Sequence, residues 1–331
     1  MGGVGQACGK VILLGEHAVV YGVPALAVGI GRGARATATP LERGPSRLHV
    51  VRWNITVREN DEEHDLARAF RALLDATRDD RPDLPPHAVE VEAELPPGGG
   101  LGCSAAMGVA VARAIDPAVS DDELQERAMA WERVFHGNPS GVDSAVAARG
   151  GCLFYRKGEA LEPVRVRGAL HLCVGSTGLA SSTRSMVEAV ARLRARRPEI
   201  VGKSFEAVRS LVSNARLAIE AGDRFALGRL MDLNQMLLGG LFVSTPEIER
   251  MCALAREAGA LGAKLTGAGG GGSVVALVPS AATAEAVLAA WHADKFDGFA
   301  TAVAPEARAR EAAPRAAGSG PALAPEGGEA P

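Results

Sequence analysis

A glycine-rich segment at positions 96–104 has a composition that could take part in chemistry. It reads Pro-Pro-Gly-Gly-Gly-Leu-Gly-Cys-Ser, follows a predicted strand and opens a predicted helix. Glycines let backbone N–H groups approach an anion, and a helix start adds the positive end of its dipole. The segment favours phosphate binding, with a plain turn as the alternative. It is neither a P-loop nor a dinucleotide fingerprint, because the Lys and the glycine spacing of those motifs are missing.

Two carboxylates follow this segment in the sequence. Glu132 lies on a predicted helix at 121–135, about 80° around the axis from the apolar stripe, where a metal ligand or a salt-bridge partner would fit. Further on, Asn138 and Pro139 are a natural N-cap and first helical position. Asp143 then falls in the first turns, where the helix dipole favours its ionised form. It suits either a general base or a complement to the dipole.

Near the N-terminus, Lys10 begins a predicted strand at 10–14 that is otherwise apolar. It is either a cation at a strand end or a lysine that pairs with a carboxylate and neutralises a transferring phosphate. Glu16 and His17 lie in the polar turn that follows. Such a turn can supply hydrogen bonds to a small polyol or acid.

A second glycine cluster at 266–273 precedes a predicted strand at 274–278. Its glycines are too dense for an ordinary hairpin, so this loop must pass close to another backbone or to a ligand. Together with the first cluster, it predicts two glycine loops that face each other across a cleft.

Hydrophobic periodicity predicts the elements that must position these residues. Strands are expected at 25–30, within 32–57, at 89–95 with an acidic outer face, and at 169–174; a hairpin is expected at 150–166. Helices are expected at 65–76, from Ser104 to Ile115, at 121–135 with Ser120 as N-cap, and at 182–196, 204–220, 225–238 and 245–257. A last helix follows the strand at 274–278.

Length and composition bound the class of protein. A chain of 331 residues predicts two domains, which we expect at 1–165 and 166–305. Residues 306–331 have little to bury and are expected to be a disordered tail. A net charge of −3 with 4% aromatic residues argues against nucleic-acid binding. Five scattered cysteines indicate free thiols, and with neither a signal peptide nor a membrane span in the sequence we expect a cytoplasmic protein.

Three segments together carry a resemblance to a known family. Residues 9–22, 136–143 and 264–272 resemble the GHMP kinase superfamily, most closely its mevalonate kinases. The resemblance extends to about residue 304. It implies an α+β fold with two domains, an N-terminal ribosomal protein S5 domain 2-like α/β domain and a C-terminal ferredoxin-like α/β domain, with the active-site cleft between them. It also implies ATP-dependent phosphorylation of the primary hydroxyl of mevalonate, a step of isoprenoid biosynthesis.

The resemblance further implies a role for each motif residue. Asp143 would be the catalytic base or charge partner, Lys10 would contact the transferring phosphoryl group, and Ser104 and Glu132 would hold Mg²⁺. The residues implied to bind ATP are Pro97, Gly98, Gly99, Gly100, Leu101, Gly102, Cys103 and Ser104. Those implied at the substrate are Glu16, His17, Thr183, Gly267, Ala268 and Gly269. The implied partners are mevalonate and ATP, with neither nucleic acid nor membrane; a homodimer is common among such proteins.

Two departures and several alternatives accompany the resemblance. Cys103 and Gly99 stand where relatives usually carry Ser and Ala, but the loop acts through backbone N–H groups, so activity should survive. Phosphomevalonate kinase, homoserine kinase and an inactive metabolite sensor remain alternatives. Mevalonate diphosphate decarboxylases lack the lysine of the opening motif, so Lys10 argues against that activity. A phosphomevalonate kinase should need an additional basic cluster, which the sequence does not reveal.

Overall fold

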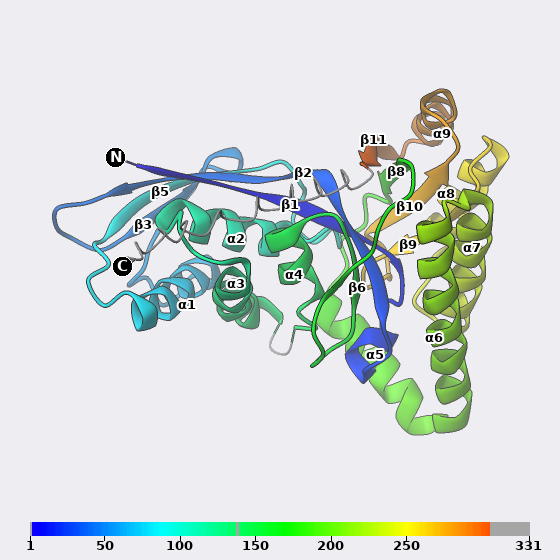
Figure 1. Cartoon of the computed structure of the whole chain (residues 1–331), viewed down its shortest axis with the longest axis horizontal. Coiled ribbons are helices and arrows are strands. Elements are labelled where there is room, and N and C mark those ends of the chain that lie inside the picture. Colours follow the sequence, from blue (N-terminus) through cyan, green and yellow to red (C-terminus); the bar gives the residue numbers. More distant parts are fainter. Residues whose placement is uncertain (1, 137–138, 305–331) are drawn as a thin grey trace, which may run out of the picture.

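The computed structural model describes residues 2–136 and 139–304. Two β-sheets dominate the described chain, and each belongs to one half of the sequence (Figure 1). The predicted tail at 306–331 and the predicted N-cap Asn138 lie outside the described residues. Within the described part, no helix combines the length and the apolar character that crossing a bilayer requires.

The first half forms a mixed, mainly antiparallel sheet of seven strands with the order β4-β3-β5-β2-β6-β7, in which β1 pairs with β2. Its strands are β1 Gly3–Leu14, β2 Ala25–Pro40, β3 Arg47–Val50, β4 Ile55–Arg58, β5 His87–Ala93, β6 Cys152–Tyr155 and β7 Glu162–Pro163. Its helices are α1 Asp65–Asp80, α2 Cys103–Ile115, α3 Asp121–His136 and α4 Val142–Arg149. These four helices lie on one side of the sheet (Figure 1).

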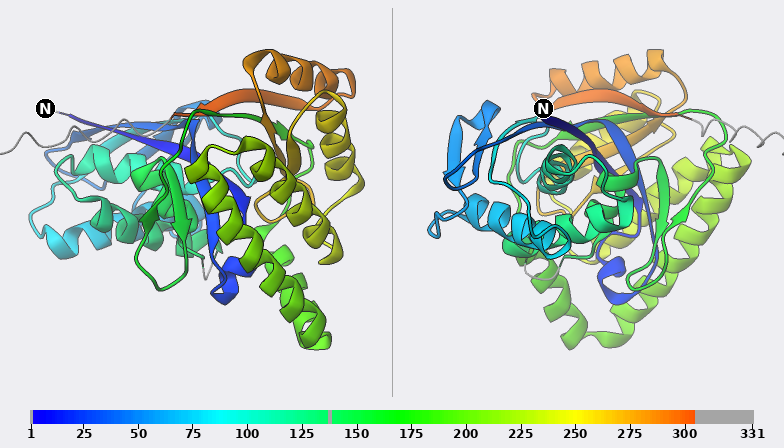
Figure 2. Two further views of the ribbon diagram at one scale, coloured as in Figure 1. Left: turned by 45° about the vertical axis from the view of Figure 1, so that its right-hand side comes forward. Right: turned by 60° about the vertical axis from the view of Figure 1, so that its left-hand side comes forward.

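The second half forms an antiparallel sheet with the order β11-β8-β10-β9. Its strands are β8 Leu170–Ser176, β9 Gly262–Thr266, β10 Ser273–Val278 and β11 Asp297–Val303. Its helices are α5 Thr183–Arg196, α6 Pro198–Ala221, α7 Arg224–Gly240, α8 Pro246–Glu257 and α9 Ala281–Ala293. Figure 2 shows α6 extending away from the first sheet, while β11 passes close to the first sheet. The chain changes sheet between Pro163 and Leu170, and we propose the domain boundary there, at 165/166.

Several predicted elements are confirmed. Helix α3 begins with a capping box, since the Glu123 N–H donates to Ser120 Oγ at 3.3 Å and the Ser120 N–H donates to Glu123 Oε2 at 2.9 Å. Strand β5 buries alternate residues and exposes its glutamates. Helices α1, α2 and α5 to α9 all form where the apolar periodicity placed them, within a few residues at most ends.

Other expectations were wrong in their bounds. Strand β1 begins at Gly3 rather than at Lys10, and helix α4 begins at Val142 rather than at Pro139. The helix starts late because its N-cap, Gly141, has φ 88° and lies against the Tyr155 hydroxyl, where a Cβ would approach to 2.6 Å. Strands β9 and β11 were not predicted at all.

A close contact between β1 and α2 places the site-bearing end of that helix. A Cβ on Gly5 would lie 2.0 Å from the Ala110 carbonyl oxygen and 2.6 Å from the Ala114 nitrogen, both on the backbone of α2. Only glycine therefore allows the helix to sit this close to the strand. Since α2 begins with Cys103 and Ser104, this contact also sets the position of the glycine-rich segment.

We predict that Gly5→Ala lowers the free energy of unfolding by about 3 kcal/mol, because the new methyl group cannot fit without moving α2. Urea denaturation monitored by circular dichroism measures the change. Gly202→Ala in α6 is the matched control: a Cβ there meets nothing within 4 Å, so the better helix former should add up to about 1 kcal/mol. Equal stability of the Gly5→Ala variant and the wild type would contradict the close packing.

Candidate active site

Two cavities meet beside the glycine-rich segment. The larger has a volume of about 320 Å³ and is lined by residues 97–100 and 102–104 with side chains from α1, α2 and α3. The smaller, of about 100 Å³, is lined by the turn after β1 and by the second glycine cluster. Gly100, Asp143 and Thr183 line both cavities. Two ligands, one in each cavity, could therefore react at this junction.

An ion pair lies at the junction. Lys10 Nζ is 3.0 Å from Asp143 Oδ1; the lysine side chain is 4% exposed and that of the aspartate 32%. Lys10 comes from the middle of β1, and Asp143 from the first turn of α4. The Lys10 backbone N–H also donates to the Leu101 carbonyl oxygen at 2.8 Å, which ties the strand to the glycine-rich segment.

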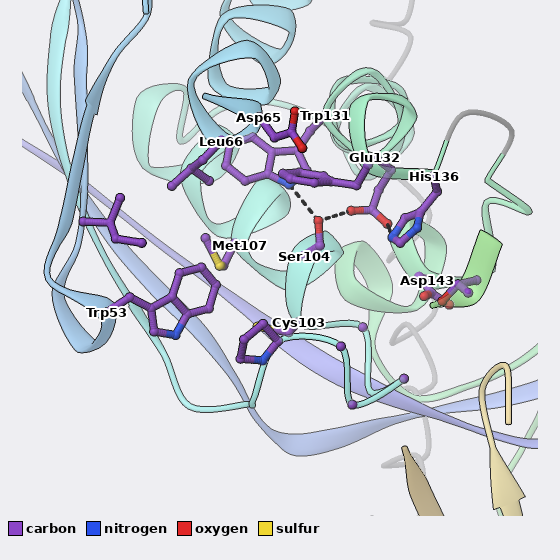
Figure 3. Close-up of a pocket in the computed structure, with 18 of the residues that line it drawn as sticks. Trp53, Asp65, Leu66, Cys103, Ser104, Met107, Trp131, Glu132, His136 and Asp143 are labelled. Carbon is purple, nitrogen blue, oxygen red and sulfur yellow. Dashed lines mark hydrogen bonds and ion pairs between the residues drawn. The ribbon is translucent and has the colours of Figure 1, made fainter. Parts of the chain in front are cut away.

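A second polar cluster lies at the start of α2, inside the larger cavity (Figure 3). Ser104 Oγ donates to Glu132 Oε1 and accepts a hydrogen bond from Trp131 Nε1 at 3.0 Å. His136 Nε2 is 3.6 Å from Glu132 Oε2, and burial lowers the pKa of this histidine. The pKa of Glu132 is raised to about 7, mainly by burial and also by the nearby Asp143, against the opposing effects of Ser104 and Lys10.

Glu132 is thus a buried carboxylate without a strong counter-charge. The residue is 2% exposed, and no lysine or arginine among residues 2–136 and 139–304 pairs with its carboxylate. Burying a carboxylate is costly unless a cation or hydrogen bonds compensate it. The hydroxyl of Ser104 and this carboxylate together suit a hard divalent cation such as Mg²⁺, which takes oxygen ligands. No group of three or more His, Cys, Asp or Glu residues in the described chain could hold a metal by itself.

The glycine-rich segment forms a loop whose conformation suits anion binding. Gly98, Gly100 and Gly102 each have φ 73°, a left-handed conformation that other residues adopt with strain. Gly102 is the N-cap of α2 and leaves the first N–H groups of the helix without a side-chain acceptor. Leu101 is the member of 97–104 that does not line the larger cavity, and it is buried.

Much of the remaining wall of the larger cavity is apolar. Its apolar side chains are those of Trp53, Ile55, Leu66 of α1, Met107 of α2, and Trp131 and Phe135 of α3; His64, Asp65 and Thr183 also line the cavity. Trp53 and Trp131 approach from different elements with Met107 between them (Figure 3). A flat heteroaromatic group would fit between such side chains. Sequence reasoning placed Trp131 in an apolar stripe and missed Trp53, for which the sequence carries no evident signal.

The two glycine loops face each other as predicted, but they touch rather than leaving a cleft between them. A Cβ on Gly267 would lie 3.1 Å from the Gly100 Cα, and Ser273 Oγ donates to the Gly99 carbonyl oxygen at 2.7 Å. The second loop therefore approaches the first backbone to backbone. The cavities lie on either side of this contact.

Most residues predicted at the substrate gather around the smaller cavity. Its lining includes Glu16, His17, Thr183, Gly267 and Ala268. Gly269 is not among its lining residues and instead accepts a hydrogen bond from Ser181 Oγ.

His17 lines this cavity in a defined tautomer. Its Nε2 lies 2.8 Å from the Ala268 carbonyl oxygen, which can only accept, so Nε2 carries the hydrogen. Burial lowers the pKa of His17, which favours the neutral ring. Nδ1 is then left as a hydrogen-bond acceptor.

Comparisons with known proteins agree with this geometry. The family model for the N-terminal domain of GHMP kinases matches residues 65–151, and the model for their C-terminal domain matches residues 215–298. The mevalonate kinase of Aeropyrum pernix is 38% identical over 289 residues, which cover 82% of this chain and 87% of that protein. The chain belongs to the GHMP kinases, among the mevalonate kinases.

Solved structures of GHMP kinases share the fold. The crystal structure of L. major mevalonate kinase in complex with R-mevalonate has a TM-score of 0.79 and 30% identity, and the match covers 93% of this chain and 97% of that one. The phosphomevalonate kinase of Streptococcus pneumoniae has a TM-score of 0.72 at 18% identity, covering 90% and 98%. The second likeness shows the fold alone. The two-domain α+β expectation is confirmed.

We predict a pH-dependent stability that arises from Glu132. Its pKa rises on folding from 4.5 to about 7, so its contribution is fully present below pH 4.5 and is lost as the pH rises to about 7. In chelator-containing buffer, the wild type should lose roughly 3 kcal/mol of unfolding free energy across this range relative to Glu132→Gln, which cannot titrate. Urea titrations at several pH values measure this. A constant difference between the two proteins would show that Glu132 titrates normally.

Proposed function

We propose that this chain transfers the γ-phosphoryl group of ATP to the primary hydroxyl of mevalonate, giving phosphomevalonate. The observation that carries the proposal is the position of the Lys10–Asp143 ion pair. Among the described residues, it lies at the only place where the two cavities share lining residues. The relatives named mevalonate kinase, at 34–38% identity over most of the chain, support the choice of substrate.

In this proposal the larger cavity takes the nucleotide. The tryptophan-rich wall would hold the base, and the backbone N–H groups of residues 98–104 would hold the phosphates. Mg²⁺ on Ser104 and Glu132 would supply positive charge to the phosphate oxygens. Nucleotide-bound Mg²⁺ ordinarily needs only one or two protein ligands because phosphates and water complete its shell, and the Ser104–Glu132 pair fits that number.

The smaller cavity takes the alcohol. Its volume of about 100 Å³ suits a small acid, and Asp143 at its border would orient the hydroxyl and accept its proton. Lys10, held 3.0 Å from Asp143, would neutralise charge on the transferring phosphoryl group. Phosphoryl transfer proceeds through a loose transition state, so positioning and charge compensation provide most of the catalysis.

The charge of the smaller cavity favours mevalonate over phosphomevalonate. Lys10 is the only lysine or arginine among the described residues that line it, and Asp143 already pairs with Lys10. A substrate that carries its own phosphate would need further cations. A single carboxylate needs less compensation.

We predict that (R)-mevalonate is the substrate in a panel of alcohols. ADP release, coupled to pyruvate kinase and lactate dehydrogenase, should be rapid with mevalonate and at background with phosphomevalonate, homoserine and galactose. Turnover with phosphomevalonate but not with mevalonate would identify phosphomevalonate as the substrate instead. Background rates with every alcohol would reject the proposal.

We predict that Asp143→Ala and Lys10→Met each lower kcat by on the order of 10²-fold or more, the scale for a positioned acid–base group or an oriented charge. Asp122→Ala is the control, since Asp122 is an exposed carboxylate paired with Arg149 outside both cavities, and its kcat should match the wild type. Near-normal turnover of either junction variant would remove the proposed mechanism.

A further inference from the structure

Lys264, in β9, is a fully buried lysine to which the proposed chemistry gives no role. Its relative exposure is 0%, and it lies where β9 meets the end of β1. The ammonium group pairs with Glu16 Oε1 and donates to the carbonyl oxygens of Leu265 and Ile12, the latter at 3.4 Å. Burial lowers the pKa of Lys264, and Glu16 opposes that effect. All three donors of the ammonium group are therefore used within the protein.

Both carboxylate oxygens of Glu16 likewise have partners within the protein. Lys264 binds Oε1, and Asn234 Nδ2, from helix α7, donates to Oε2 at 3.1 Å. Glu16 belongs to the turn after β1 in the first half of the chain, whereas both partners belong to the second half. Although Glu16 borders the smaller cavity, its carboxylate oxygens bind residues of the other half, which suits a structural link better than a substrate contact.

The residue next to Glu16 needs such a link. His17 has φ 60° and ψ −48°, a backbone conformation that residues other than glycine rarely adopt. A residue stays in such a conformation only when its surroundings hold it there. Two further contacts attach the end of β1 and the turn after it to β9 and to the glycine cluster. The Ile12 N–H donates to Thr266 Oγ1 at 2.8 Å, and His17 Nε2 donates to the Ala268 carbonyl oxygen at 2.8 Å.

We propose that Lys264 is a positioning residue for the alcohol substrate, acting through Glu16 to hold His17 in the wall of the smaller cavity. The proposal rests on the proposed function, because it takes that cavity as the site of the alcohol. The larger cavity contains neither Lys264 nor Glu16 nor His17 in its lining. Loss of the link should therefore affect the alcohol and leave the nucleotide bound as before.

The test compares two variants of the whole chain. Lys264→Met leaves an unpaired buried carboxylate and could fail to fold, so the double variant Lys264→Met/Glu16→Gln, which removes both charges, is measured beside it. In the double variant we expect the KM for mevalonate to rise about tenfold or more, the scale of a small misplacement at a reacting site. The KM for ATP should stay within about twofold, because the nucleotide site keeps its contacts.

The matched control breaks a buried ion pair elsewhere. Arg127 and Asp116, 2% and 5% exposed, pair at 2.9 Å on the helical side of the first half, outside the lining of both cavities. The double variant Arg127→Met/Asp116→Asn should change neither KM. An unchanged mevalonate KM in the Lys264 double variant, or an equal rise of both KM values, would overturn the proposal.

Hydrogen exchange separates this proposal from the proposed function. In the Lys264 double variant, peptides covering residues 15–22 should exchange faster than in the wild type, while those covering 97–104 should not change. If the wild type fails to phosphorylate mevalonate, the proposed function is wrong, and the exchange pattern still decides whether Lys264 holds the turn. Unchanged exchange at 15–22 would overturn the positioning role.

Discussion

The ion pair between Lys10 and Asp143 is the interaction around which the site is built. Lys10 lies in the middle of β1, so its ammonium group can be buried only if a carboxylate reaches it from another element. Helix α4 must therefore begin where it does, with Asp143 in its first turn. The Lys10 backbone N–H meanwhile donates to the Leu101 carbonyl oxygen, which fixes the glycine-rich segment to the same strand. One position of β1 thus aligns a carboxylate, an ammonium group and the start of α2.

Four buried charged residues in and near the two cavities differ in how they are compensated. Lys10 pairs with a partly exposed carboxylate that can still meet a ligand, whereas Lys264 and Glu16 satisfy each other away from solvent. Glu132 lacks a basic partner stronger than His136 within the described chain. Burial is the main cause of its raised pKa, and the opposing effects of Ser104 and Lys10 do not cancel it. The lack of a strong basic partner makes this carboxylate the one best suited to bind an external cation.

The sequence was most informative where short-range chemistry dictates structure. The N-cap at Ser120, the alternation in β5 and the glycine-rich turn at 96–104 all depend on neighbours along the chain. The proximity of Lys10 to Asp143 came from the motif resemblance rather than from spacing, since 133 positions separate them in the sequence.

What the sequence concealed depends on contacts between distant segments. Strand β1 was predicted to begin only at Lys10, yet residues 3–9 also belong to it, and α2 packs directly on the backbone at Gly3 and Gly5. Strand β9 carries a lysine at its centre, which suggests a solvated segment until the Glu16 carboxylate is placed beside it. The role of Lys264 was hidden for the same reason: a buried ion pair between the two halves leaves no local pattern.

The contact between the two glycine loops explains why the site needs two such loops. Gly100 and Gly267 touch backbone to backbone. Because neither has a side chain, the partition that they form between the cavities is thin. In the proposed function, a phosphate at the first loop and an alcohol beside the second are separated by little more than two backbones. They would meet where Gly100, Asp143 and Thr183 line both cavities. A larger residue at either glycine would widen the partition and move the reacting atoms apart, which is the kind of misplacement that phosphoryl transfer tolerates least.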